Sequence, residues 1–545
     1  MTATANRWDA IVIGSGFGGA MVAHRLLAGG ARVLMIERGG WVERGPAAWQ
    51  PEASLELTPH YDREIPYRCV AGGYKPEVAG YACVGGPSVF YGCTSFRFRE
   101  RDFAGDPDVV ADSGAAFPFA YDELEPYYDE AEQLLQIAGD DQGDPTAPRR
   151  RRPYPQPPAA LAPVSERLAA AARARGLSPF HLPLAINGTV TTPPPSGATP
   201  TAGRVPAPTE ALTAVRTTCQ ACRTCDTFAC AIEAKNDVAT MMIKPAIARG
   251  LVLRPGTVVT GLIRAGRRIV GVDVIDRATG ATERLVADTV VLAAGALGTP
   301  HLLLASGLDE VSSARAAVGR YLMRHANAMV FGFYPRRPDP DHVFHKQLAI
   351  HDWYFGAPGK DAAGMTKLGG VQQVMTPPRQ LVRAHLPWGV RGPIGALTEQ
   401  LTGLLCIAED QPRAVNGVTV DRARLDRFGL PQLVIETRYS DRDRRAVAAL
   451  VRRAKQVLRG SGAWFFHTHQ IKTFSHALGT VRMGRDPATA PVDPAGRFRG
   501  LDNLWIADGS VLPLSAGVNP SLTIAATALR TADFVAGVRN PDETS

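Results

Sequence analysis

Residues 9–19 read Asp-Ala-Ile-Val-Ile-Gly-Ser-Gly-Phe-Gly-Gly, a short apolar run that leads directly into a glycine-rich turn. Residues 20–27 continue with helical periodicity, and residues 32–36 form a second apolar run that ends at Glu37. This order of strand, glycine turn, helix and strand predicts a βαβ unit with two parallel strands. We therefore expect the chain to begin with an α/β fold of the Rossmann type.

The glycines of this turn match the spacing G-x-G-x-x-G at Gly14, Gly16 and Gly19. The first glycine permits a tight turn, the second lets a pyrophosphate approach the backbone, and the third lets helix and strand pack closely. The unpaired N–H groups at the helix start would face the phosphates. Glu37 lies 18 residues beyond Gly19, where its carboxylate can accept hydrogen bonds from the ribose hydroxyls. The segment therefore predicts dinucleotide binding, and a tight structural turn is the alternative.

Two later segments bear on which dinucleotide binds. Residues 287–300 (ADTVVLAAGALGTP) read as a buried strand that enters a turn of small residues, and residues 503–510 (NLWIADGS) read as a short strand before Asp508-Gly509. A nucleotide site spread from one end of the chain to the other suits a long flavin lying across a sheet. A nicotinamide site is usually complete within one compact domain.

Composition narrows the class of protein. A chain of 545 residues with 45% hydrophobic and 21% charged residues is ordinary for a globular protein of two domains. The net charge of +8 is scattered, and the single cationic run, Arg149 to Arg152, lies in a proline-rich loop, so we expect no nucleic-acid partner. We find no export signal and no 18-residue apolar run, and so expect no membrane span. Eight cysteines do not make a disulfide scaffold, and we expect a cytoplasmic protein.

Several other elements can be placed by pattern. Residues 122–137 read as an acidic helix, and residues 263–291 hold two alternating runs that predict strands meeting at a turn. Ser440 can cap a helix over residues 441–458 whose apolar positions share one face. Residues 191–208 are rich in Pro, Thr, Ser and Gly and are expected to form a surface excursion.

Five blocks, in this order, resemble the glucose–methanol–choline (GMC) oxidoreductase family over most of the chain. The blocks are Gly14 to Gly19 with Glu37; Val84 to Gly92 with Arg97 and Asp102-Phe103; Ala293 to Ala296; His476 to Thr480 with Arg482 to Gly484; and Asp508 to Ser510 with Asn519 to Thr523. The regions 139–208 and 333–440 match less clearly. The resemblance implies an α/β (overall α+β) protein in which a Rossmann-like FAD-binding domain is interleaved with a substrate domain built on a mainly antiparallel sheet with helices.

From this resemblance we assign residues 1–104, 209–332 and 465–545 to the FAD-binding domain. Residues 105–208 and 333–464 form the substrate-binding domain with its surface excursions.

The resemblance also implies which residues contact FAD. They are Gly14, Gly16, Phe17, Gly18, Gly19, Glu37, Gly85, Gly86, Ser88, Gly92, Val259, Ala294, Gly295, Asp508, Gly509, Asn519, Pro520 and Ser521. In some members a histidine of the glycine-rich segment bonds covalently to the flavin. Here Phe90 and Tyr91 stand at the comparable positions, and no histidine lies between Arg68 and Arg99. We therefore expect FAD to be bound without a covalent link.

Alcohol oxidation by a flavin needs a hydride transfer to N5 and a proton transfer to a base, which favours histidine. A second polar group should hold the same oxygen. By resemblance, His476 is the base and Asn519 its partner. The alternatives are a buried structural histidine for His476 and a helix cap for Asn519.

Other histidines are assigned no catalytic role. His467 and His469 form an H-x-H pair without a third metal ligand nearby, and we place them in a loop at the pocket or the surface. His301 and His325 flank buried strands and are expected to be structural.

Four cysteines, Cys219, Cys222, Cys225 and Cys230, form the least expected feature of the chain. Their spacing departs from iron–sulfur runs and from zinc ribbons. Comparable cysteines occur in gluconate-dehydrogenase-like relatives, a few of which carry an iron–sulfur cluster. Packed thiols or a local disulfide are favoured, and an iron–sulfur cluster or a zinc site stays open as the alternative.

The sequence thus predicts FAD-dependent oxidation of a primary or secondary alcohol on a polar small molecule, a sugar or an aminoglycoside-type intermediate. The electron acceptor is oxygen, a quinone or another acceptor. The alternatives are a flavin-containing lyase of the hydroxynitrile type and a flavin-bound redox-sensing protein.

Overall fold

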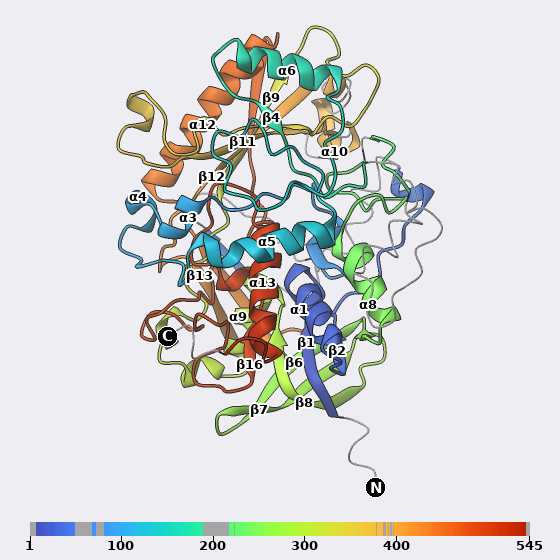
Figure 1. Ribbon diagram of the computed structural model, residues 1–545, viewed down its shortest axis with the longest axis vertical. Helices are drawn as coiled ribbons and strands as arrows, with labels where there is room; N and C mark the ends of the chain where they lie inside the picture. The colour runs from blue at the N-terminus through green and yellow to red at the C-terminus, as the bar shows by residue number, and fades with distance from the viewer. Residues whose placement is uncertain are drawn as a thin grey trace.

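The computed structural model describes residues 7–49, 68–71, 81–188, 217–222, 224–377, 379–384, 388–390, 392, 395 and 397–540. Two large sheets organise the molecule. A seven-stranded sheet lies in the lower half of the view in Figure 1, and a six-stranded sheet lies in the upper half. The segments that carry the predicted reactive residues run between the two sheets.

The seven-stranded sheet begins with the predicted βαβ unit. The central strand β1 (Arg7–Ile13) pairs in parallel with β2 (Val33–Ile36) on one side and with β8 (Thr282–Leu292) on the other. All four residues of β2 are buried, as expected for a strand covered on both faces. The sheet order is β5-β2-β1-β8-β7-β6, and β16 pairs with β8; the other strands are β5 (Val252–Arg254), β6 (Thr257–Ala265), β7 (Arg268–Asp276) and β16 (Leu504–Ile506).

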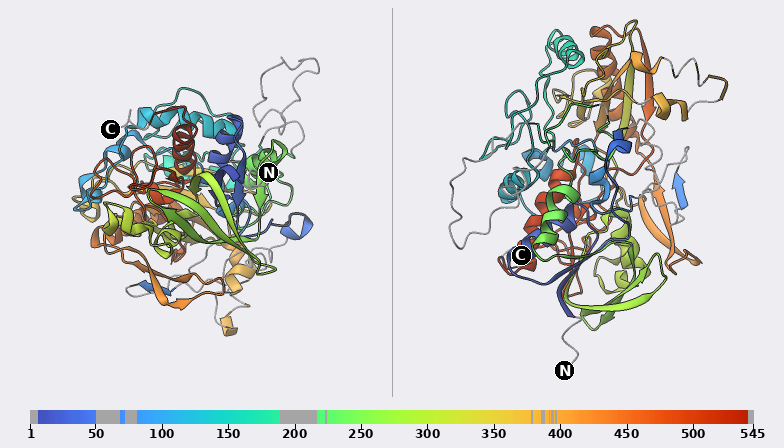
Figure 2. Two further views of the ribbon diagram at one scale, coloured as in Figure 1. Left: turned by 90° about the horizontal axis from the view of Figure 1, so that it is seen from below. Right: turned by 90° about the vertical axis from the view of Figure 1, so that its right-hand side faces the viewer.

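Helices from distant parts of the chain cover this sheet. Helix α1 (Phe17–Ala28) packs beside α13 (Ser521–Val535), although about 500 residues separate them in sequence. Figures 1 and 2 show the blue α1 next to the red α13, with α5 (Tyr121–Leu135) crossing over α13. Helix α9 (Gly295–Ala305) follows β8. The two ends of the chain therefore build one half of the molecule together.

The second sheet has the order β15-β9-β12-β11-β10-β4, and every one of its pairings is antiparallel. One face packs against α12 (Asp441–Gly460), through residues such as Leu450 and Leu458. The opposite face carries a separate apolar cluster that includes Phe331, Val374 and Leu405. The strands are β4 (Phe180–His181), β9 (Ala326–Phe333), β10 (Leu348–Ile350), β11 (Gly369–Val374), β12 (Leu401–Ala408) and β15 (Phe465–Gln470).

A third sheet has the order β13-β14-β3, from strands β13 (Gly417–Leu425), β14 (Pro431–Thr437) and β3 (Arg68–Ala71). The remaining helices are short or peripheral: α3 (Glu100–Ala104), α4 (Pro107–Val110), α6 (Pro163–Arg173), α8 (Lys244–Ala248) and α10 (Arg379–Ala384). Helix α6 packs against α12.

The elements predicted by pattern are confirmed with small shifts of their ends. Strands β7 and β8 form the expected hairpin, and α5 covers most of the predicted acidic helix. Ser440 caps α12 by accepting a hydrogen bond from the backbone N–H of Asp443 at 3.1 Å. The predicted excursion at 191–208 lies outside the described residues.

The predicted domain boundaries remain a prediction. Two of them, 332/333 and 464/465, fall at strands β9 and β15, and these two strands pair with each other in the six-stranded sheet.

Candidate active site

The glycine turn after β1 leaves no room for side chains at three of its positions. A Cβ on Gly14, whose φ is +104°, would lie 2.3 Å from the carbonyl oxygen of Ala293. A Cβ on Gly18 would lie 1.6 Å from the carbonyl oxygen of Ala507, and one on Gly19 would lie 2.0 Å from that of Gly14. The turn thus packs directly onto the segments after β8 and β16, as the predicted distributed site requires.

Gly16 differs from these three, because a Cβ there would meet nothing within 4 Å. Gly16 is the N-cap of α1, no side chain caps the helix, and its first turn, which begins with Phe17, holds no acidic residue. A 12-residue helix that begins at an uncapped glycine beside open space, without a local carboxylate, favours a bound phosphate at that end.

Glu37 at the end of β2 is buried and is held beside the glycine turn. Its Oε2 accepts hydrogen bonds from the backbone N–H of Ser15 at 3.1 Å and from the Ser15 hydroxyl at 2.6 Å. Ser15 Oγ in turn accepts a hydrogen bond from the backbone N–H of Gly85 at 3.0 Å. Burial raises the pKa of Glu37, whereas the hydrogen bonds from Ser15 and Gly39 lower it. Ser15 connects two predicted cofactor segments, and the sequence analysis missed it.

The second glycine-rich segment is folded tightly around Ser88. The Ser88 hydroxyl donates to the carbonyl of Gly85 at 2.7 Å and accepts from the backbone N–H of Val238 at 3.1 Å. Gly85 and Gly86 have φ of +91° and +54°, and a Cβ on Gly86 would lie 3.4 Å from the Cα of Gly16. The two glycine segments therefore face each other.

Gly92, at the end of this segment, lies against an ion pair. Lys346 Nζ and Asp226 Oδ1 are 2.8 Å apart, and a Cβ on Gly92 would overlap both groups. A side chain at Gly92 would displace this pair.

Asp508 connects the turn after β8 with the turn after β16. Its Oδ2 accepts hydrogen bonds from the backbone N–H of Gly295 at 2.9 Å and from the Thr299 hydroxyl at 2.5 Å, and its Oδ1 accepts from the backbone N–H of Ser510 at 2.8 Å. Burial raises the pKa of Asp508, and these hydrogen bonds oppose the shift.

The other predicted cofactor residues lie around the same turns. The Ala294 N–H donates to the Thr299 hydroxyl at 3.2 Å, and the Gly509 carbonyl accepts from the backbone N–H of Gly479 at 3.1 Å. Val259 is buried in β6. Pro520 and Ser521 begin α13, where the Ser521 hydroxyl donates to the carbonyl of Thr94 at 3.2 Å. An FAD molecule fits these features: the two glycine-rich turns, the uncapped start of α1 and the buried carboxylate of Glu37.

The two predicted reactive residues lie side by side between the sheets. His476 comes from the loop after β15, and Asn519 from the turn before α13. Asn519 Nδ2 is 3.4 Å from His476 Nε2, and Asn519 Oδ1 accepts a hydrogen bond from Gln372 Nε2 on β11 at 3.0 Å. Asn519 precedes the N-cap residue Pro520, and its side chain is directed at His476 and Gln372.

His325, predicted to be structural, contacts His476, the predicted base, directly. His325 Nδ1 lies 3.0 Å from His476 Nδ1, and the two rings meet edge to face. His325 Nε2 lies 2.9 Å from the carbonyl oxygen of Ser515. The sequence analysis missed this contact, because 151 residues separate the two histidines and no local pattern joins them.

The lowered pKa values of His325 and His476 favour the neutral form of both rings at pH 7. Burial lowers the pKa of His325 to about 4. Burial also lowers the pKa of His476 well below its usual range, and electrostatic interactions with His325 and with the cationic Lys346 lower it further. A neutral imidazole is the form that can accept a proton.

The remaining histidines lie elsewhere. The expected surface position of His467 and His469 is confirmed, but the expected loop is wrong, because both belong to the edge strand β15, where they are exposed. His301 is buried, and its Nε2 lies 2.7 Å from the carbonyl oxygen of Pro431, as expected of a structural histidine.

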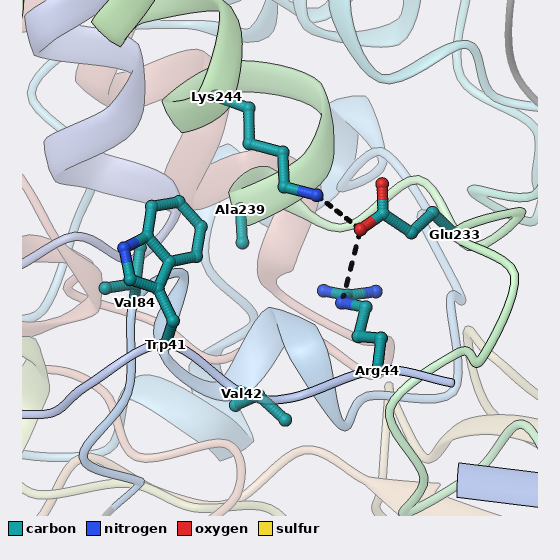
Figure 3. A pocket seen from close by; sticks show the side chains of 7 residues that line it. All are labelled: Trp41, Val42, Arg44, Val84, Glu233, Ala239 and Lys244. Atoms are coloured by element: carbon teal, nitrogen blue, oxygen red, sulfur yellow. Dashed lines mark hydrogen bonds and ion pairs between the residues drawn. The ribbon is translucent and has the colours of Figure 1, made fainter. Parts of the chain in front are cut away.

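A cavity of about 300 Å³ opens beside the second glycine segment (Figure 3). Trp41 stands on one side of it, and Arg44 and Lys244 both form ion pairs with Glu233 on the other. The predicted reactive residues, His476 and Asn519, do not line this cavity.

The four clustered cysteines are all free thiols. Cys225 Sγ lies 3.7 Å from Cys93 Sγ, next to the second glycine segment, and the hydrogen bond from Cys93 lowers the pKa of Cys225 to about 7. Among the described residues, no group of three His, Cys, Asp or Glu side chains is arranged to hold a metal ion.

Comparison with known proteins identifies the family. Two family models described as GMC oxidoreductase match the chain, the N-terminal model over residues 78–327 and the C-terminal model over residues 412–528. The chain belongs to the GMC oxidoreductase family. The predicted resemblance, the mixed α/β fold and the FAD cofactor are thereby confirmed.

Curated GMC relatives match along nearly the whole chain. The paromamine 6'-oxidase of Streptomyces fradiae is 31% identical, over 97% of this chain and 91% of its own length. The 6'''-hydroxyparomomycin C oxidase of Streptomyces lividus is 30% identical, over 98% and 92%. The 2-methyl-1,2-propanediol dehydrogenase of Mycolicibacterium austroafricanum is 27% identical, over 98% and 96%.

Solved structures share the fold of this GMC oxidoreductase. Pyridoxine 4-oxidase from Mesorbium loti aligns with a TM-score of 0.64 and 21% identity over 96% of this chain and 98% of its own. A formate oxidase from Aspergillus oryzae RIB40 aligns with a TM-score of 0.66 and 17% identity over 99% and 100%. The protein is an FAD-dependent oxidoreductase acting on CH–OH groups, and the lyase alternative is not favoured. Among the described residues, no helix is both long and apolar enough to cross a membrane.

Proposed function

We propose that this GMC oxidoreductase oxidises a hydroxyl group of a polar small molecule, a sugar or an aminoglycoside-type intermediate, with His476 as the base and Asn519 as its partner. The observation that carries the proposal is the approach of Asn519 Nδ2 to His476 Nε2 at 3.4 Å, at the meeting of the two sheets. Two relatives named as oxidases of aminoglycoside compounds support the substrate class.

The contacts of His325 support Nε2 of His476 as the basic nitrogen. A backbone carbonyl can only accept, so His325 Nε2, which lies 2.9 Å from the Ser515 carbonyl, must carry the proton of this neutral ring. His325 Nδ1 is then an acceptor, and His476 Nδ1, 3.0 Å away, must donate to it. His476 Nε2 is left with its lone pair directed at Asn519.

This arrangement performs the proton half of the reaction. The substrate hydroxyl would donate its proton to His476 Nε2 and accept a hydrogen bond from Asn519 Nδ2, which fixes the oxygen from two sides. When bound, FAD supplies the hydride acceptor for the carbon atom. Glu37, the start of α1 and the glycine segments would hold the cofactor.

The test is anaerobic reduction of the FAD-loaded protein by a panel of polar alcohols that includes hexoses, paromamine and 1,2-propanediol. We expect at least one alcohol to bleach the visible absorbance of the flavin. If none of them does, the proposal fails. Reoxidation of the reduced protein by oxygen and by a quinone, in separate samples, then identifies the electron acceptor.

A further inference from the structure

A series of polar contacts runs from the Ser515 carbonyl through His325 and His476 to Asn519 and Gln372. Its last atom, Gln372 Oε1, is a hydrogen-bond acceptor. Since His476 Nε2 carries no proton, the Asn519 atom that faces it at 3.4 Å must be the amide nitrogen Nδ2. Asn519 Oδ1 then points away from the histidine, toward β11. The positions of the oxygen and the nitrogen in the Asn519 carboxamide are thus assigned from the hydrogen-bonding roles of its neighbours.

Gln372 is oriented by the same argument. Asn519 Oδ1 is an acceptor, so the Gln372 atom 3.0 Å from it must be the donor Nε2. The other end of that carboxamide, Gln372 Oε1, is therefore an acceptor. The Ser515 carbonyl can only accept a hydrogen bond, and this determines which atom donates and which accepts in each later contact. The side chains involved are His325, His476, Asn519 and Gln372.

Gln372 Oε1 is left without a donor. The side chain is only 2% exposed, and no residue that the structure describes donates a hydrogen bond to this oxygen. An unsatisfied buried acceptor is energetically costly, and buried acceptors in native proteins are satisfied in the great majority of cases. The missing donor is therefore expected to come from a bound molecule.

Gln372 Nε2 lies 3.0 Å from Asn519 Oδ1, so a molecule that binds beside Asn519 is the expected source of the donor. Its register partners, Leu405 on β12 and then Met329 on β9, share its face of the six-stranded sheet. The neighbours on this face form the apolar cluster around Phe331 and Val374. Asn327 lies on the same face, and its buried Oδ1 also lacks a donor among the described residues.

We propose that Gln372 Oε1 accepts a hydrogen bond from a second O–H or N–H group of the substrate, close to the hydroxyl that is oxidised. Gln372 is then a specificity-determining residue that selects vicinal diols and amino alcohols over simple alcohols. The inference rests on the proposed function, because it takes the substrate oxygen to lie between His476 and Asn519. It adds that the substrate must carry a donor beside the reacting carbon, and not merely be polar.

The experiment compares 1,2-propanediol with 1-propanol and with 2-fluoro-1-propanol, which is similar in shape to the diol but cannot donate at the second position. Anaerobic flavin reduction measures the rate constant for each alcohol with the FAD-loaded wild-type protein. We expect kcat/KM for the diol to exceed that of both analogues by about 10- to 100-fold. Equal values for the three alcohols would overturn the inference and leave the proposed function intact.

The variant Gln372→Met removes the acceptor at similar volume. We expect it to lower kcat/KM for the diol and to bring the ratio of diol to fluoro analogue close to one. The matched control is Gln373→Met, on the same strand but facing the other side of the sheet, where Gln373 Oε1 accepts from Ser165. Gln373→Met should keep the wild-type ratio.

The outcomes separate the two claims. A Gln372→Met protein that retains the wild-type ratio overturns the specificity role. If the variant does not fold, the wild-type comparison of the three alcohols decides alone. If no alcohol of the panel bleaches the wild-type flavin, the proposed function fails and this inference fails with it.

Discussion

His325 Nδ1 lies 3.0 Å from His476 Nδ1, and the tautomer that we propose for His476 as the base follows from this contact. His325 itself is fixed by the Ser515 carbonyl on one side, and its backbone N–H donates to Asp410 Oδ1 at 3.1 Å. In the proposed reaction His325 would be a positioning residue, because it would act through His476. The backbone at His325 has a φ of +61°, which a β-branched side chain would tolerate poorly.

Replacing His325 by asparagine tests this role, since asparagine tolerates positive φ but cannot reach both partners. We expect His325→Asn to slow flavin reduction by about 10- to 100-fold, because the tautomer and the angle of His476 are no longer held. The visible spectrum of bound FAD should stay as in the wild type. Rapid anaerobic mixing measures the rate, and an unchanged rate would refute the positioning role.

The pH dependence of flavin reduction should reflect the lowered pKa of His476. The folded protein disfavours the protonated ring, so the neutral, active form persists as the pH falls below the ordinary value of 6.5. We therefore expect the rate constant to stay on its plateau through pH 6.5 and to fall only at more acidic pH.

The variant Lys346→Met provides a second test of the lowered pKa of His476. Lys346 contributes to the lowered pKa of His476, so its removal should move the acid limb of the profile to higher pH. A wild-type profile that already inflects between pH 6.5 and 7.5 would contradict the assignment of a neutral, buried base.

The flavin should be released when the protein is denatured. Phe90 and Tyr91 stand where some relatives have the histidine that bonds to the flavin, and the glycine-rich segment contains no histidine. Acid precipitation should leave the pellet colourless and the yellow FAD in solution. Flavin that stays in a washed pellet would show a covalent bond.

The clustered cysteines should hold no stoichiometric iron. The described thiols include the pair of Cys93 and Cys225 at 3.7 Å, and these residues form no group of three metal ligands. An iron and acid-labile sulfide assay on purified holoprotein should therefore find far less than one iron per chain. Three or four iron atoms per chain would show that an iron–sulfur cluster is present.

Local signals in the sequence predicted much of the fold. The glycine turn, the buried strand before Glu37, the Ser440 cap and the β7–β8 hairpin each depend on a short run of neighbouring residues. Such features follow from periodicity and capping, because the physics that forms them is local.

The contacts that shape the candidate site are of another kind. Ser15, His325 and Gln372 were missed, and each acts through a residue from 22 to 151 positions away. A serine inside a glycine turn and a glutamine within an antiparallel strand carry no pattern that marks them. Their roles follow only from the atoms that the fold places next to them.

The variant His476→Ala tests the central claim most directly, with His467→Ala on the exposed edge of β15 as the matched control. The measurement is the rate of anaerobic flavin bleaching by the best alcohol of the panel. The account predicts a loss of about 10²-fold or more for His476→Ala and no change for His467→Ala. Bleaching by His476→Ala at the wild-type rate would contradict it.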